Sequence, residues 1–288
     1  MNYTQMNKEE LLSLSAELKA EYESVKSEGL SLDMSRGKPG AQQLTLTQDI
    51  LTVLKTEEDC KAENGFDCRN YGVPDGLPEC RRLFSELLDI PAENIIIGGA
   101  SSLNLMYDYI NQCMFLGVCG NKPWKEQGRI KFICNVPGYD RHFAIAEFFG
   151  IEMISVEMLP DGPDVEKIAE HIKDPAVKGM FCVPKYSNPS GVTYSDEKVK
   201  ALAALKPAAP DFRVIWDNAY IVHDLTDTPD SVLNIFGACR EFGTGGKLTT
   251  VATKRIQPSN KLKFIHRLCH IFCNIIPSIF PFLHPIHK

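Results

Sequence analysis

The sequence predicts an α/β fold with three layers, α/β/α, around a mostly parallel sheet. Short apolar runs alternate with amphipathic stretches, which is typical of parallel strands joined by helices. We expect strands at 131–135, 152–156, 179–183 and 212–216, and helices at 140–149, 163–173 and 195–205. Polar residues follow two of these strands, at Asn188 and Asp217, which lie 29 residues apart. Because parallel strands end at one edge of a sheet, where ligands bind, we expect a site there.

Apolar residues at helical spacing predict a long first helix over residues 5–28. Leu11, Leu18 and Tyr22 fall on one face of it, and charged residues occupy the others. Gly and Pro then close a loop at 31–39. The other expected elements are helices at 47–56, 79–88, 103–115 and 231–242 and a short buried strand at 95–97.

Composition limits the classes of protein. The 288 residues are 44% hydrophobic and carry a net charge of -6 with a pI near 5.7, which argues against nucleic acid as a partner. The apolar stretch 262–283 is interrupted by prolines and lacks the ~20 apolar residues of a membrane span, so no membrane is expected. The polar first 30 residues do not read as an export signal. We therefore expect a cytoplasmic protein whose ten cysteines are reduced.

The charge changes abruptly near Gly246. Residues 246–288 hold seven Lys or Arg and no acidic residue, which leaves 24 basic and 37 acidic residues, a net charge of -13, in residues 1–245. Such a shift indicates a boundary. We expect a helical arm over 1–30, a ligand-binding large domain over 31–245, and a basic tail over 246–288 in which no further strand is predicted.

A small-residue turn follows the expected strand at 95–97. Gly98-Gly-Ala-Ser-Ser102 would place free backbone N–H groups and two hydroxyls at the start of a helix, which suits an anion. An ordinary turn with a serine N-cap is the other interpretation.

Asp217 ends the strand at 212–216. Its carboxylate could hold a protonated ring nitrogen, or it could bind magnesium in a nucleotide site. The second interpretation needs a Gly-x4-Gly-Lys-Ser/Thr loop, and the nearest run, Gly245-Gly-Lys247, lacks the first glycine and the hydroxyl residue.

Aromatic and metal-binding residue types give further candidates. Tyr139 follows a strand and could stack on a flat ligand or simply be half buried in a Pro-Gly turn. His142 and His223 are expected to be hydrogen-bonding supports rather than catalysts. The run His266-x-x-Cys-His-x-x-Cys273 has ligand types that suit zinc, but its spacing is too compressed, so no metal site is expected.

Five short sequence blocks follow one another along the chain, and their order is informative. They are Tyr71-Gly-x-Pro-x-Gly, Gly98-Gly-Ala-Ser-Ser102, Pro137-Gly-Tyr139, Ser187-Asn-Pro-x-Gly and Asp217-x-x-Tyr220. In this order they resemble the signatures of fold type I aminotransferases, enzymes that depend on pyridoxal phosphate (PLP). Arg36-Gly-Lys-Pro39 and the run after Pro137 are similar to an aspartate-aminotransferase-like branch that is grouped with MocR-type regulators. The match covers roughly residues 5–243.

The resemblance implies a role for each block. Ala100, Ser101 and Ser102 would bind the cofactor phosphate. Tyr71 would reach the phosphate of a partner subunit in a homodimer. Gly37 would contact the substrate carboxylate.

Four further residues would bind the cofactor ring by the same resemblance. Tyr139 would stack on it, Asn188 and Tyr220 would hydrogen-bond its phenolic oxygen, and Asp217 would pair with its nitrogen. The small-molecule partners would be an amino acid and a 2-oxo acid.

The sequence departs from the family after Asp217. The family has a Schiff-base lysine in a Ser-x-Ser-Lys-like block some three dozen residues beyond the aspartate. Lys254 lies 37 residues beyond it, but Val251-Ala-Thr-Lys-Arg255 contains no serine. The family's C-terminal small domain has no counterpart either, so a truncated or frame-shifted chain is expected.

These departures leave several functions open. An aminotransferase, impaired in this chain, is the first expectation. A non-catalytic PLP-binding remnant and another PLP enzyme, such as a C–S lyase, are the alternatives. A regulator's effector domain would need a helix-turn-helix that the N-terminal region lacks.

Overall fold

The computed structural model describes residues 3–31, 40–46, 48–99, 101–221, 224, 225, 227 and 248–251, which belong to two units, 1–47 and 48–288. The first unit contains η1 (Tyr3–Gln5), α1 (Lys8–Ser27) and α2 (Ala41–Thr45). A capping box starts α1, because Asn7 accepts from the Glu10 N–H at 3.0 Å and the Glu10 carboxylate accepts from the Asn7 N–H at 2.8 Å. The predicted first helix is confirmed.

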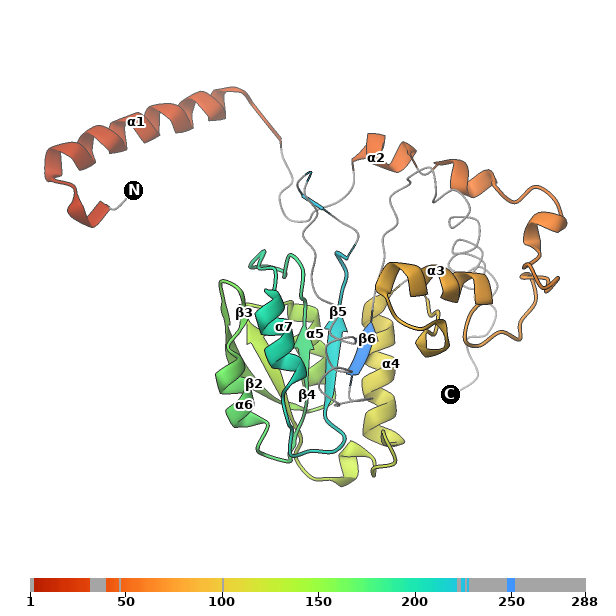
Figure 1. Cartoon of the computed structure of the whole chain (residues 1–288). Helices are drawn as coiled ribbons and strands as arrows, with labels where there is room; N and C mark the ends of the chain where they lie inside the picture. The colour runs from red at the N-terminus through yellow and green to blue at the C-terminus, as the bar shows by residue number, and fades with distance from the viewer. Residues whose placement is uncertain are drawn as a thin grey trace, which may run out of the picture. The chain divides into compact units, whose positions relative to one another are not determined.

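The second unit is built on a six-stranded sheet with the order β3-β2-β1-β4-β5-β6 (Figure 1). The strands are β1 (Lys131–Val136), β2 (Glu152–Leu159), β3 (Gly162–Pro163), β4 (Val177–Cys182), β5 (Arg213–Asp217) and β6 (Leu248–Val251). Only the β2–β3 pair among these is antiparallel. The four predicted strands and the mostly parallel sheet are confirmed.

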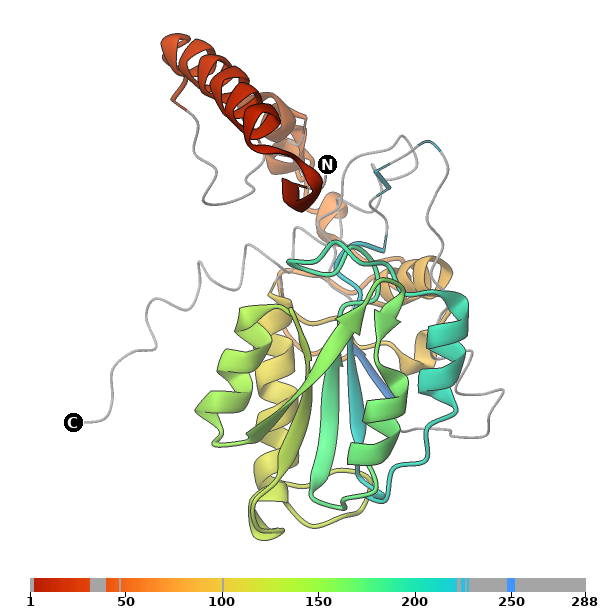
Figure 2. The same cartoon turned by 90° about the vertical axis from the view of Figure 1, so that its left-hand side faces the viewer.

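Helices cover both faces of this sheet (Figure 2). These helices are α4 (Ser102–Phe115) and α5 (Asp140–Phe148) on one face and α6 (Val165–His171) and α7 (Asp196–Ala203) on the other. The unit also contains α3 (Pro78–Leu88), which packs in a separate apolar cluster, and the 3-10 turns η2 (Gln48–Thr52), η3 (Glu58–Cys60), η4 (Ala92–Asn94) and η5 (Trp124–Glu126). Neighbouring strand residues point to opposite faces. Phe132 therefore packs in the core under α4 and α5, whereas Ile133 packs in the core under α6 and α7. This is the three-layer arrangement that the alternation predicted.

Three local predictions differ from the structure. Residues 95–97 form no strand; the Ile97 N–H donates to the Asp75 carbonyl at 3.0 Å and Ile96 is exposed. The expected helix at 47–56 is only the short 3-10 turn η2. Conversely, β6 occurs where no strand was predicted, and it pairs in parallel with β5 so that Val251 lies opposite Asp217. The expected helix at 231–242 lies outside the described residues.

A buried polar cluster closes the edge of the sheet at which the strands begin. Lys178 at the start of β4 donates to Asp211 just before β5, at 2.8 Å, and both side chains are almost fully buried. The Trp124 indole and the Gln127 amide donate to the other Asp211 oxygen at 3.0 and 2.9 Å. Both carboxylate oxygens are therefore hydrogen-bonded, which makes the buried charge tolerable.

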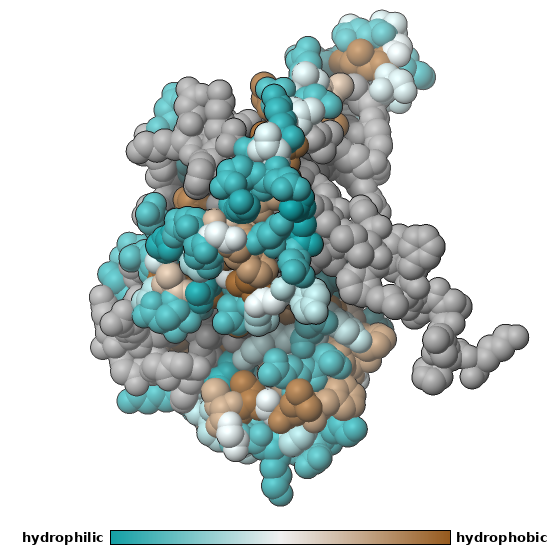
Figure 3. All heavy atoms as spheres, turned by 90° about the vertical axis from the view of Figure 1, so that its right-hand side faces the viewer, coloured by the Kyte–Doolittle hydropathy of each residue, from teal (hydrophilic) through white to brown (hydrophobic). Residues whose placement is uncertain are grey.

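Apolar side chains remain exposed at the end of α4. Phe115 and Leu116 are 48% and 76% exposed, and Figure 3 shows apolar atoms gathered at the lower end of one face of the molecule. The Lys125 ammonium covers the Phe115 ring at 4.5 Å from its centroid. Exposed apolar surface of this kind is common at protein contacts, but the expected homodimer stays a prediction.

Candidate active site

Asp217 is the last residue of β5, and its carboxylate is buried with one oxygen unpaired. Its side chain is 6% exposed, and Oδ2 lies 3.0 Å from His142 Nε2. Oδ1 is buried and has no hydrogen-bond partner among the described residues. A buried carboxylate oxygen without a donor is costly, so this atom indicates a place for a ligand N–H.

His142 supports this carboxylate from α5. The imidazole is buried and stacks on Phe181 of β4, with ring centroids 4.8 Å apart and planes inclined by 13°. Tyr139 meets the same imidazole edge-on at 5.1 Å. Packing on two sides fixes the ring so that Nε2 faces Asp217. The prediction that His142 is a hydrogen-bonding support is confirmed, and His223 lies outside the described residues.

Tyr139 lines a pocket near the ends of β1 and β4. The residue precedes α5 in the Pro-Gly turn, where a side chain on Gly138 would place its Cβ 2.2 Å from the Asn135 carbonyl oxygen. Only glycine fits this turn. The pocket is lined by Tyr139, His142, Phe181, Val183 and Ser187, among others.

The loops that carry Asn188 and Tyr220 also lie at the edge of the sheet where the parallel strands end. Asn188 follows Ser187 of the pocket and is exposed in a turn after β4. Tyr220 follows β5 and is half buried, with its ring centroid 6.4 Å from that of Tyr186. The structure therefore brings Tyr139, Asn188, Asp217 and Tyr220 to the end of three adjacent strands, as the sequence predicted.

Ser101 and Ser102, the last residues of the small-residue block, lie at the start of α4, which begins at the end of the sheet where β5 finishes (Figure 1). Ser101 is the N-cap, and its hydroxyl accepts from the Asn104 N–H at 3.4 Å. The serine-cap interpretation is thus confirmed for Ser101. Ser102 begins the helix, and the backbone N–H groups of a helix start are those that an anion would need. Phosphate binding at this point stays a prediction.

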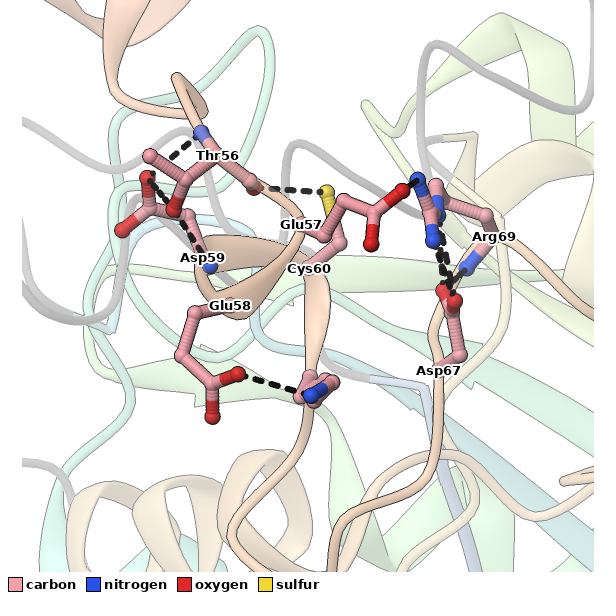
Figure 4. Close-up of polar contacts among 8 residues, drawn as sticks. Thr56, Glu57, Glu58, Asp59, Cys60, Asp67 and Arg69 are labelled. Atoms are coloured by element: carbon pink, nitrogen blue, oxygen red, sulfur yellow. Dashed lines mark hydrogen bonds and ion pairs between the residues drawn. The ribbon is translucent and has the colours of Figure 1, made fainter.

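Tyr71 follows, two residues later, an arginine that is held by ion pairs (Figure 4). Arg69 pairs with Asp67 at 2.6 Å and with Glu57 at 3.7 Å, and the Thr56 hydroxyl donates to Asp59 at 2.9 Å. The Arg69 hydrogen bonds lower the pKa of the Asp67 carboxyl to about 2. Tyr71 itself is 93% exposed. An exposed phenol at this position suits the predicted reach toward another subunit.

Three predicted site residues, Gly37, Ala100 and Lys254, lie outside the described residues. Two others that matter here were not singled out from the sequence, Phe181 behind His142 and the buried Lys185 after β4. A lysine directly between an apolar strand and the Asn-Pro block was the available signal for Lys185. Within the described part of the chain, no cluster of His, Cys, Asp or Glu could hold a metal, and no helix is long and apolar enough to cross a membrane.

Comparison with known proteins supports one family. A model of the aspartate amino-transferase family matches residues 6–257. An aspartate aminotransferase of Corynebacterium glutamicum is 47% identical over 222 residues, which are 77% of this chain and 51% of that protein. A crystal structure of an aspartate transaminase from the same species superposes with a TM-score of 0.77. It is 42% identical and the match covers 86% of this chain and 58% of the solved one.

A regulator gives a weaker match. An uncharacterized HTH-type transcriptional regulator of Bacillus subtilis is 26% identical over 138 residues, 48% of this chain and 30% of that protein.

The chain spans only about half the length of the curated aminotransferase it matches. The family match, in contrast, extends over most of this chain and across both Asp217 and β6. The chain therefore belongs to the aspartate amino-transferase family.

Proposed function

We propose that this chain binds PLP and forms the cofactor-binding part of an aminotransferase that moves an amino group between an amino acid and a 2-oxo acid. The unpaired, buried Oδ1 of Asp217 carries the proposal. The name of the relative from Corynebacterium glutamicum, at 47% identity, supports the reaction class. Because the seven described cysteines are all free thiols, a cytoplasmic site of action is part of the proposal.

The residues around Asp217 fit a pyridine ring. Oδ1 would accept the N–H of a protonated ring nitrogen, and the bond from His142 to Oδ2 would hold the carboxylate in the plane of that contact. Tyr139, which lines the neighbouring pocket, would flank the ring. When bound, PLP supplies an electron sink for bonds at the substrate α-carbon. A buried anion beside the nitrogen would keep that nitrogen protonated.

The other polar groups at this edge would fix the ends of the cofactor. The start of α4, with Ser101 and Ser102, would bind the phosphate. Asn188 and Tyr220 would bind the phenolic oxygen. Tyr71 would reach the phosphate of a second subunit, which makes a homodimer part of the proposal.

We further propose Lys254 as the lysine that holds the cofactor and moves the proton at the substrate α-carbon. Strand β6 ends at Val251, directly opposite Asp217. In the sequence, Lys254 follows Val251 by three residues, a stretch that spans at most about 11 Å when fully extended. The unexpected strand β6 therefore favours this candidate, although no serine precedes it.

Borohydride trapping tests the proposal. Purified chain is mixed with PLP, reduced, digested and mapped by mass spectrometry. We expect a visible absorption band before reduction and one phosphopyridoxyl group on Lys254 after it, and the Lys254→Ala variant should lose both. Lys247→Ala, another tail lysine, is the matched control and should retain both.

The outcome also separates two functions. Saturable binding of PLP without a reducible adduct would favour a non-catalytic PLP-binding chain, for which the missing Ser-x-Ser context is the supporting observation. Failure of the wild-type chain to bind PLP at all would contradict the proposal.

A further inference from the structure

An ion pair between a buried lysine and a more exposed aspartate joins the loop after β4 to the loop after β5. Lys185 has a side chain that is only 3% exposed, and its Nζ lies 2.7 Å from Oδ1 of Asp224. Burying an ammonium is costly unless a partner and fixed geometry compensate for it. The structure thus accepts a buried charge at the edge of the sheet that carries the candidate active site.

Tyr186, the next residue, makes two more contacts to the same loop. Its hydroxyl oxygen accepts from the Leu225 N–H at 3.3 Å, and its ring lies tilted by 56° against that of Tyr220 with centroids 6.4 Å apart. The Lys185 ammonium lies 5.2 Å from the Tyr186 ring centroid, so the two side chains also support each other.

The backbone of Tyr186 is strained. Its φ is +48°, in the left-handed region that residues with a Cβ seldom adopt. Such strain persists where surrounding contacts demand it, and it often occurs at functional sites. Here the conformation sends Lys185 inward to Asp224 while the Tyr186 hydroxyl reaches Leu225. Two successive side chains therefore contact two successive residues of one loop.

These contacts occur at two places in the loop after β5, one at its start and one four to five residues further along the sequence. Tyr186 touches the loop at Tyr220 itself, and Lys185 and Tyr186 touch it again at Asp224 and Leu225. Contacts at two points would restrict the conformations open to Tyr220, and with them the position of its phenol.

We propose that Lys185 and Tyr186 are positioning residues that hold Tyr220 where it can bind the phenolic oxygen of PLP. The inference rests on the proposed function, because Tyr220 has this task only if the chain binds the cofactor. Lys185 and Tyr186 act through the loop and do not themselves touch the ring. We call the contacts of Lys185 and Tyr186 with this loop the clamp. If the clamp is released, the position of Tyr220 that can bind PLP is less populated, and the apparent affinity for PLP falls by that fraction.

The first experiment measures the loop without cofactor. Hydrogen exchange of a peptide containing Ile221 to Leu225 is compared in wild type, Lys185→Met, Asp224→Asn and Tyr186→Phe. We expect exchange to accelerate by about tenfold in each variant, with less than additive effects in the Lys185→Met/Asp224→Asn double variant. Lys198→Met is the control, because its pair with Asp161 at 3.7 Å is on α7, and it should leave this peptide unchanged.

The second experiment measures the bound cofactor. Apparent PLP affinity and the wavelength of its absorption band are compared in wild type, Lys185→Met, Tyr220→Phe and the double variant of these two. We expect Lys185→Met to shift the band in the same direction as Tyr220→Phe and to weaken binding about tenfold, and to add little once Tyr220 has lost its hydroxyl. If Lys185 served only the stability of the fold, the effects of Lys185→Met and Tyr220→Phe on PLP affinity would add in the double variant.

The results distinguish the clamp from the proposed function. Unchanged exchange in Lys185→Met and Tyr186→Phe would overturn the clamp, as would faster exchange with an unaltered PLP band and affinity. Tyr186→Phe removes only a hydroxyl, so it keeps the test valid if Lys185→Met does not fold. If the wild-type chain binds no PLP, the proposed function fails and the positioning role falls with it, whereas the exchange data still show whether the clamp exists.

Discussion

Replacing Asp217 with asparagine is expected to weaken PLP binding by about 10- to 100-fold. The variant keeps the shape of the side chain and loses the negative charge that would face the ring nitrogen. A hydrogen bond to a charged group contributes about 1.5–3 kcal/mol, and each 1.4 kcal/mol is about tenfold in affinity. Equilibrium titration with PLP, followed by absorbance, measures the change.

The stability of the cofactor-free Asp217→Asn variant provides the control. A buried carboxylate with one unpaired oxygen costs more than a buried amide, so the free energy of unfolding should be equal to or higher than that of wild type. Glu157→Gln, which changes only an exposed pair with Lys167 at 3.9 Å, should alter neither quantity. A less stable Asp217→Asn variant with unchanged PLP affinity would show that Asp217 serves only to hold His142.

Replacing Asp211 with asparagine is expected to lower the free energy of unfolding by about 3–5 kcal/mol. The ammonium of Lys178, with its side chain 5% exposed, would lose its counter-charge and stay buried. Urea unfolding at neutral pH, followed by tryptophan fluorescence, measures the loss; Trp124 itself donates to Asp211. Glu157→Gln is again the exposed comparison and should cost less than about 1 kcal/mol.

Acid should erase this difference. Burial alone would raise the pKa of the Asp211 carboxyl, but hydrogen bonds from Lys178 and Gln127 outweigh it, so the folded-state pKa lies below the ordinary value. The group therefore stabilises the fold above its unfolded pKa of about 3.9, and that contribution disappears as the pH falls through the lower folded pKa. A gap between wild type and Asp211→Asn that stays constant from neutral to strongly acidic pH would contradict this account.

The elements with strong periodicity could be predicted without coordinates. The strands around Phe132, Met180 and Ile215 are apolar runs buried on both faces, and their hydrophobicity is sufficient to identify them. The order of the polar blocks was sufficient to place Tyr139, Asn188, Asp217 and Tyr220 at one edge, because parallel strands all end on the same side.

Predictions failed where a strand depends on its neighbours. Ile95-Ile-Ile97 is as apolar as a buried strand, yet it pairs with no strand in the described chain, and Ile96 is exposed. Leu248-Thr-Thr-Val251 is short and lies in a basic stretch without alternation, yet it forms β6 because β5 offers a free edge beside it. Strand formation is decided by pairing and burial more than by local preference.

The sequence by itself determined the α/β class, the main strands and helices, and the edge of the sheet at which polar residues gather. Only the tertiary structure decided which of them meet. His142 bonds Asp217 across 75 residues, Trp124 bonds Asp211 across 87, and Lys185 bonds Asp224 across 39. Periodicity reports the face that a residue occupies, whereas a contact between distant residues depends on strand order and loop geometry, which no local pattern encodes.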